Sequence, residues 1–204
     1  MISFSPTRLA VLGTMSDLHQ QASRYDLACL QKVVADVSPD LLCAEITLEA
    51  WESDDLSKGS LELREALAPV VTSTDIVLIP VSPTVEKYSD FVPNTPWKTG
   101  VVRAFDRLLQ WGQLKADDVR AINGPLFGAF CHSVCLLSEM FWNAEDRARW
   151  ESQNEHLANN IVRAVQRDSG RRVLVAVQCQ RLHRLLPLLH AHEDLFTIVD
   201  YQDL

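Results

Sequence analysis

The sequence predicts an α/β fold with a mostly parallel central sheet of about five strands flanked by helices. Short apolar runs alternate along the chain with longer segments whose apolar residues recur at helical spacing. Strands separated by helices pair in parallel, because each helix returns the chain to the same end of the sheet. The chain has 204 residues, 47% of them hydrophobic and 23% charged, which predicts a single globular domain over residues 1–204.

Five short apolar runs predict the strands. They are Arg8–Gly13, Asp40–Ile46, Ile76–Val81, Arg172–Val177 and Leu195–Val199. The first run ends at a glycine and the third ends before Ser82-Pro83, and both kinds of residue interrupt regular structure. The lengths of these runs suit strands that are buried on both faces.

Apolar residues at helical spacing predict the connecting segments. The expected helices are Ser23–Val37, Leu61–Leu67, Thr99–Leu114, a segment from Asn143 to about Asp168, and Leu182–His190. Asn143 is the predicted N-cap of its helix, because its side chain can accept from a free backbone N–H and acidic residues follow. The polar stretch Glu49–Lys58 is expected to be a loop.

The composition excludes several function classes. The seven glycines are scattered, and neither a dinucleotide fingerprint nor a glycine-rich phosphate loop is present. Nineteen basic and 27 acidic residues give a net charge of −8, which disfavours nucleic acid as a partner. We expect no membrane association, because no apolar run approaches about 18 residues. The absence of a secretion signal and an odd count of five cysteines indicate a cytoplasmic protein with reduced thiols.

Residues that could bind or react lie where the predicted strands end. Ligands of parallel α/β sheets bind beyond the carboxyl ends of the strands. The first strand is followed by Thr14, Ser16, Asp17 and His19, the second by Glu45, and the fourth by Gln178, Arg181 and His183. A carboxylate placed like that of Glu45 is either solvated or held in a crevice with a raised pKa, which suits proton transfer.

The order of four motifs resembles the TraB/TIKI superfamily, which includes erythromycin-esterase-like and haem-binding ChaN-like proteins. The motifs are Gly13-Thr14-Met15-Ser16, Pro39-Asp40 followed by Glu45, Gln153-Asn154 followed by Ile161, and Gly170-Arg171-Arg172-Val173 followed by Gln178-Cys179-Gln180-Arg181. The resemblance covers about half of the chain and implies the fold of that superfamily. Residues 54–143 carry no motif that can be assigned.

This sequence departs from the family at the positions that matter most for a metal. The resemblance implies histidines where Ser16 and Arg181 stand, an arginine at Gln153 and a glycine at Gln178. Glu45 alone does not make a divalent metal site, which needs three or four donors. We therefore expect no metal and no cofactor, with His19 and His183 able to act as substitutes only if the backbone shifts.

The first functional hypothesis is a metal-independent enzyme, of the hydrolase or lyase class, acting on a small anionic molecule. Glu45 would be the general acid and base, assisted by Asp17 or His19. Arg181 would bind the anion, in a crevice also lined by Thr14, Ser16, Gln178 and His183. This arrangement needs the side chains of Glu45 and Arg181 to lie within about 8 Å of each other.

Two alternatives stay open beside the enzyme. In one, Glu45 and Arg181 form a structural ion pair and the chain is an inactive binding or scaffold protein. In the other, a haem or another small molecule binds through His19 or His183. A homo-oligomer is compatible with any of these hypotheses.

The remaining clusters of polar and aromatic residues favour structural roles. The segment Cys131-His132-x-x-Cys135 predicts buried thiols rather than a metal site. The acidic residues Asp54, Asp55, Glu62 and Glu65 are expected to form a solvated face. Four tryptophans are expected to pack in the core or under a lid, namely Trp97, Trp111, Trp142 and Trp150.

Overall fold

A computed structural model describes residues 6–22, 24–116 and 118–204 and contains one sheet with the strand order β3-β2-β4-β1-β5. The strands are β1 (Thr7–Thr14), β2 (Leu41–Ala44), β3 (Val77–Pro80), β4 (Arg172–Gln178) and β5 (Phe196–Ile198). Every neighbouring pair is parallel. The predicted α/β class and all five predicted strands are confirmed, with small shifts at the strand ends.

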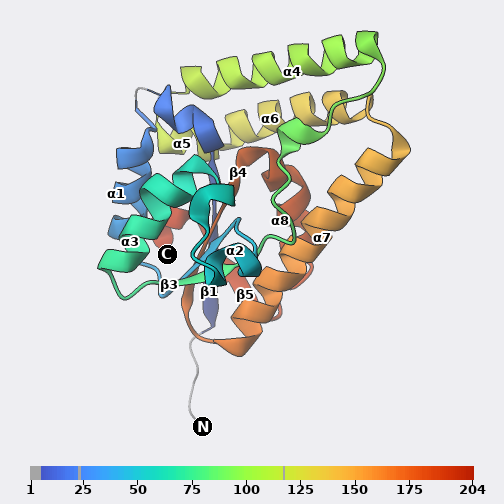
Figure 1. The fold of residues 1–204 in the computed structure, drawn as a ribbon. Coiled ribbons are helices and arrows are strands. Elements are labelled where there is room, and N and C mark those ends of the chain that lie inside the picture. The colour runs from blue at the N-terminus through green and yellow to red at the C-terminus, as the bar shows by residue number, and fades with distance from the viewer. Residues whose placement is uncertain (1–5, 23, 117) are drawn as a thin grey trace.

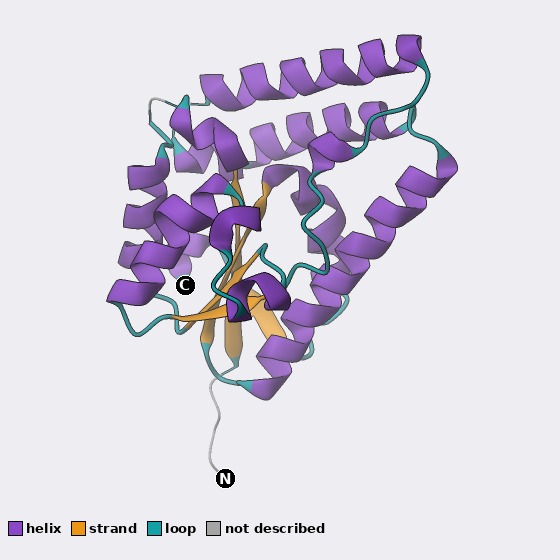
Figure 2. Ribbon diagram, viewed as in Figure 1, coloured by secondary structure: helices purple, strands orange, loops and turns teal. Residues whose placement is uncertain are grey.

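Helices surround this sheet on both faces and at one end (Figure 2). They are α1 (Leu27–Val37), α2 (Leu48–Glu52), α3 (Ala68–Ser73), α4 (Pro96–Lys115), α5 (Val119–Asn123), α6 (Pro125–Glu139), α7 (Ala144–Arg167) and α8 (Leu182–His190). Figure 1 shows α1 and α3 on one side, α7 and α8 on the other, and α4 and α6 across the top.

The two faces of the sheet bury alternate residues of each strand, as the pleat requires. Ala10 and Leu12 of β1 face the cluster that contains α1 and α3, whereas Leu9 faces the cluster formed with α7 and α8. In β4 the same alternation separates Leu174 from Val175. Both faces are covered, so the strands are nearly continuous apolar runs.

Side-chain caps fix where several helices begin. The Oδ1 atom of Asn143 accepts from Asp146 N at 2.7 Å, which confirms the predicted start of α7. Asp26 accepts from Cys29 N at 2.8 Å, so α1 begins at Leu27 rather than at Ser23, a residue outside the described part of the chain. The prediction of a loop over Glu49–Lys58 is wrong at its start, because Thr47 caps the short helix α2.

The four tryptophans expected in the core or under a lid divide into two pairs. Trp142 and Trp150 are buried, as expected. The prediction is wrong for Trp97 and Trp111, which are 61% and 59% exposed. Helix α4 turns Val102 and Leu109 toward the core, which leaves both tryptophans on the other side.

The chain leaves β1 and β4 toward opposite faces of the sheet. After β1 it continues through the short 3-10 helix Ser16–Gln20 to α1, and after β4 it continues to α8 on the other face. Such a divergence between adjacent strands opens a crevice at their carboxyl ends. The α4 and α6 helices lie across this end, away from the start of β1 (Figure 1). Among the described residues, no helix is long and apolar enough to cross a membrane.

Candidate functional site

The carboxyl ends of β1, β2 and β4 meet, as expected, because β4 lies between β2 and β1 in the sheet. Glu45 follows β2 and Arg181 follows β4, and their side chains form a direct ion pair from Arg181 Nε to Glu45 Oε1. The predicted proximity of these two residues is therefore confirmed. The pair is removed from water, with side-chain exposures of 1% for Arg181 and 9% for Glu45.

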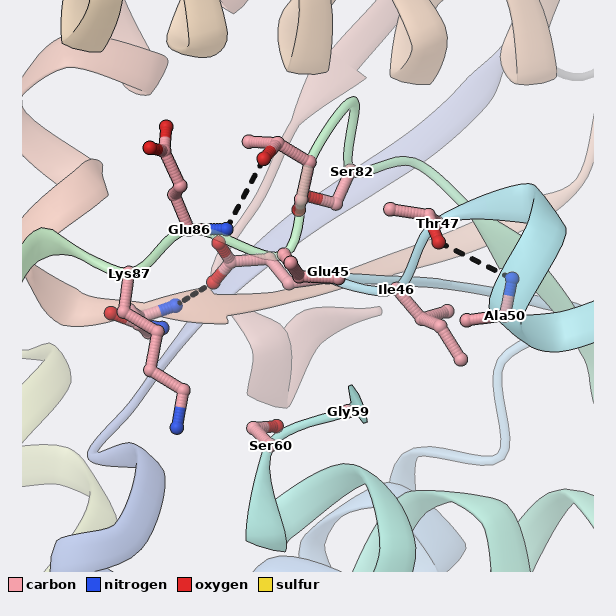
Figure 3. A pocket seen from close by; sticks show the side chains of 12 residues that line it. Glu45, Ile46, Thr47, Ala50, Gly59, Ser60, Ser82, Glu86 and Lys87 are labelled. Atoms are coloured by element: carbon pink, nitrogen blue, oxygen red, sulfur yellow. Dashed lines mark hydrogen bonds between the residues drawn. The ribbon is translucent and has the colours of Figure 1, made fainter. Parts of the chain in front are cut away.

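Both carboxylate oxygens of Glu45 are engaged. The second oxygen accepts from the backbone N–H of Gln178, a bond drawn in Figure 3. A pocket beside this carboxylate, lined also by Ser60, Ser82 and Lys87, has a volume of about 20 Å³, which is enough for one water molecule but not for a substrate. Glu45 is therefore held as a charged acceptor of protein hydrogen bonds.

Arg181 uses its remaining donors within the protein. Its Nη1 atom lies 3.3 Å from Asn154 Oδ1, and its Nη2 atom lies 3.4 Å from Glu86 O and 3.5 Å from Gln153 Oε1. The guanidinium also lies over the Trp150 ring, 4.2 Å from its centroid. The expectation that Arg181 binds a substrate anion does not fit this geometry, because protein groups surround a side chain that is only 1% exposed.

A second buried network forms at the end of β1 around Glu62. Glu62 Oε1 accepts from Thr14 Oγ1 at 2.8 Å, and Oε2 accepts from Ser16 N at 2.7 Å. The same Oε2 lies 3.3 Å from His19 Nε2. The prediction of a solvated acidic face is wrong for Glu62, which is 3% exposed, although Glu65 beside it is exposed.

His19 is built into this network rather than presented to a ligand. It is 1% exposed, its Nδ1 lies 2.7 Å from Tyr25 O, and its Nε2 accepts from Met15 N at 3.0 Å. Both ring nitrogens are thus used by backbone groups of the protein. The structure therefore does not support a role for His19 in proton transfer or haem ligation.

Asp17 and His183 pair with residues other than Glu45. Asp17 is exposed and pairs with Lys87, with 3.1 Å between Oδ2 and Nζ. His183 lies on α8, with its Nε2 3.4 Å from Glu139 Oε1 and its ring against that of His132. No group of three histidine, cysteine, aspartate or glutamate side chains in the described ranges is arranged to hold a metal ion. The absence of a metal and of a cofactor stays a prediction.

A larger cleft lies beside Gln178, between the ends of β1 and β4 and helix α4. We call it the strand-end cleft; its volume is about 160 Å³ and it is lined by Met15, Ser16, Asp17, Leu18, Lys87, Tyr88, Ser89, Asp106, Leu109, Gln110, Gln113, Gln178 and Gln180. Three of the predicted residues, Ser16, Asp17 and Gln178, therefore line a cleft that is large enough for a small molecule. Glu45 and Arg181 do not line it.

Asp106 is the second carboxyl group of this cleft, beside Asp17. It lies on α4 between Val102 and Leu109, on the side of the helix that turns inward. Burial raises the pKa of Asp106 to about 6. Within the described chain no side chain or backbone group hydrogen-bonds to it or pairs with it. A partly buried, unpaired carboxyl with a pKa near neutrality is suited to general acid–base catalysis.

Three further polar groups of the cleft lack protein partners in the described ranges. The Oγ atom of Ser16 and the Oε1 atom of Gln113 are buried and unpaired, and the Gln178 amide makes no side-chain hydrogen bond. Ser16 also has a φ of 53°, a conformation that is strained for a residue with a side chain. Buried polar groups are normally satisfied by protein or water, so these three can hydrogen-bond a bound molecule.

Sequence reasoning missed two of the acidic residues that matter here. Asp106 stands four residues after Val102 and three before Leu109, so a charged residue on the inward side of an apolar helix was the available signal. Ala66 follows Glu62 by four residues, one turn of an α-helix. Glu62 directly precedes the π-helical turn Leu63–Leu67, which the spacing of apolar residues does not reveal.

No family model, curated protein or solved structure matches this chain. The TraB/TIKI resemblance therefore stays a prediction that rests on the four motifs. Its two diagnostic positions in this chain, Ser16 and Arg181, occupy different environments: Ser16 lines the strand-end cleft, and Arg181 is enclosed by the Glu45 network.

Proposed function

We propose that this protein is an enzyme that performs acid–base chemistry on a small polar molecule in the strand-end cleft, with Asp106 as the group that transfers the proton. The observation that carries the proposal is Asp106 itself, an unpaired carboxyl with a pKa raised by burial to about 6 in a cleft at the sheet's carboxyl end. General acids and bases of this kind contribute about 10²–10⁴-fold to a rate. The reaction needs no metal in this scheme.

The lining favours a neutral, hydroxyl- or amide-bearing molecule over an anion. Lys87 is the only cation among the described lining residues, and it is paired with Asp17. Gln113 Oε1 can accept a hydrogen bond from the ligand and Ser16 Oγ can donate one. A ligand anion would also approach Asp106, whose charged form would repel it. We therefore replace the expected anionic substrate with a neutral polar one.

The alternative is a binding or scaffold protein without catalysis. The observation that favours it is the complete pairing of Arg181 and Glu45, which makes that motif structural. Both functions use the same cleft. They differ only in whether the bound molecule is converted.

A ligand panel followed by a turnover assay tests the proposal. Polyols, sugars, amides and carboxylates are screened by thermal shift against the wild type, Asp106→Asn and Gln113→Leu, with the exposed Asp194→Asn as the matched control. We expect a neutral compound to stabilise the wild type and Asp194→Asn, and to stabilise Gln113→Leu less, because that variant loses a hydrogen-bond acceptor.

Conversion of that compound is then followed by NMR. We expect turnover by the wild type and about 10²–10⁴-fold slower turnover by Asp106→Asn with binding retained. Binding without turnover in the wild type would support the scaffold alternative. Absence of any stabilising compound, or full activity in Asp106→Asn, would overturn the proposal.

A further inference from the structure

A second cavity lies on the other side of Cys179, between α5, α6 and α8. Its volume is about 350 Å³ and it is open to solvent on one side. Its walls are mainly apolar and include Ile122, Phe127, Leu182, Leu186 and Pro187. Gln113 Nε2 donates to Cys179 Sγ at 3.1 Å, and this contact separates the cavity from the strand-end cleft. The cavity therefore plays no part in the proposed acid–base chemistry.

The polar part of the cavity wall consists of Asn123, whose side chain is bonded to Gly13 and Val119, and of two histidines. The rings of His132 and His183 meet edge to face, with 5.0 Å between their centroids. The His183 side chain is 5% exposed, its Nδ1 has no partner in the described chain, and its Nε2 is 3.4 Å from Glu139 Oε1 without hydrogen-bond geometry. A nearly buried imidazole with an unsatisfied nitrogen needs a hydrogen-bond partner from outside the protein.

The electrostatic surroundings keep His132 neutral near pH 7. Burial, together with the neighbouring His183 and Arg184, lowers the pKa of His132, and Glu139 opposes this shift. Arg184 is itself paired with Glu139, so the charges nearest to the histidines largely compensate each other. The polar end of the cavity thus offers the neutral imidazole of His132, next to the ring of His183.

We propose that this cavity binds an apolar molecule that carries a single hydrogen-bonding group at one end. The apolar part would pack against Phe127 and Leu186, and the polar group would meet the imidazoles of His132 and His183. The volume is within the range of about 300–1,000 Å³ that is typical of small-molecule sites, which are mostly apolar with a few placed polar groups. The segment Cys131-His132-x-x-Cys135 then contributes a cavity wall instead of a metal site.

Gly128 of α6 keeps part of this space open. A Cβ atom at Gly128 would meet no other atom within 4 Å, and the residue lines the cavity. Glycine inside a helix is unfavourable relative to other residues, and no close packing in the structure requires it at this position. A larger side chain at position 128 would therefore fill the cavity without disturbing the fold.

The test compares Gly128→Leu with Gly100→Leu. Gly100 is also helical, and a Cβ atom at this position would likewise meet nothing within 4 Å, but Gly100 is exposed on α4 and lies outside the cavity. The probes are 1-decanol and decanoate, measured by thermal shift and by titration calorimetry. We expect the wild type and Gly100→Leu to bind at least one probe, and Gly128→Leu to bind it at least about tenfold more weakly because the site is filled.

Two further measurements keep the outcome decisive. The difference in affinity between 1-decanol and decanoate identifies which end group the cavity prefers. His132→Phe should weaken binding of the preferred probe about fivefold, because a hydrogen bond is lost. If Gly128→Leu does not fold, the wild type is tested instead: the methyl NMR signals of Ile122 and Leu182, which line the cavity, must shift when the probe is added. Failure of both probes to bind the wild type, or equal binding by Gly128→Leu, would overturn the inference and leave the acid–base proposal untouched.

Discussion

Glu45 and Asp106 lie at the same end of the sheet and have opposite surroundings. Glu45 has a cation on one oxygen and a backbone N–H on the other. Asp106 has no partner in the described chain, and burial raises its pKa to about 6. A carboxylate whose charge is fully compensated is a structural element, whereas one that is desolvated without compensation can exchange protons near neutral pH. The position at the end of a strand does not by itself separate these two roles.

Arg181→Met should produce the largest effect in the molecule. Removal of the guanidinium leaves the Glu45 carboxylate buried without its cation, which typically costs about 3–5 kcal/mol of unfolding free energy. Urea denaturation measures this loss. The matched control is Arg149→Met, because Arg149 also lies over an aromatic ring and pairs with carboxylates, yet its side chain is 47% exposed.

The control should lose no more than about 1 kcal/mol, as exposed ion pairs do. Adding Glu45→Leu to Arg181→Met should recover part of the loss, because the uncompensated charge is then removed. If Arg181→Met is as stable as the wild type, the Glu45 network is not structural and the anion-binding role of Arg181 must be reconsidered.

Glu62→Gln should have the next largest effect. Its carboxylate accepts from Thr14 Oγ1 and Ser16 N, and an amide in its place turns an NH₂ group toward one of these donors. Unsatisfied or opposed buried donors cost about 1–3 kcal/mol. Glu65→Gln is the control on the same helix and should change the unfolding free energy by less than about 0.5 kcal/mol.

The sequence predicts the scaffold far better than the chemistry. The strands and α8 are recovered nearly to the residue, because apolar runs bounded by glycine, proline and caps are local signals. The meeting of Glu45 and Arg181 is also predictable, since it needs only the parallel strand order. Whether that pair is free or enclosed depends on Asn154, Gln153 and Trp150, which come from the distant helix α7.

The strand-end cleft is less predictable because it, too, depends on a helix that is distant in the sequence. Its outer wall is α4, in a segment that carries no assignable motif, and helical spacing does not say that the side with Val102 and Leu109 faces the ends of β1 and β4. The exposed Trp111 and the inward Asp106 reverse what hydrophobicity alone suggests. Tertiary packing against the strand ends decides this orientation.

Asp106→Asn should stabilise the protein in a pH-dependent way. The pKa of Asp106 is higher in the folded state than its ordinary value near 4, so the folded protein binds the proton more tightly than the unfolded chain. The contribution of Asp106 to the unfolding free energy of the wild type is therefore fully present below about pH 4 and is lost as the pH rises to about 6. Asparagine carries no charge and avoids this loss.

At neutral pH the unfolding free energy of Asp106→Asn should exceed that of the wild type by about 1–2 kcal/mol, after allowance for solvent screening of a partly exposed group. This difference should vanish near pH 4. Urea denaturation at the two pH values measures it, and Asp194→Asn should show no such dependence. An equal stability difference at both pH values would mean that Asp106 has an ordinary pKa and is no better placed for proton transfer than a surface carboxylate.

Lys87→Met should have the smallest effect and completes the comparison. Lys87 lines both the small pocket at Glu45 and the strand-end cleft, and its ion pair with Asp17 is largely exposed. Such pairs contribute about 0–1 kcal/mol, so the melting temperature should barely change. The response to carboxylates should be as weak in this variant as in the wild type, since neither presents an unpaired cation to the cleft. A carboxylate that stabilises the wild type but not Lys87→Met would restore the anionic substrate and assign its recognition to Lys87 instead of Arg181.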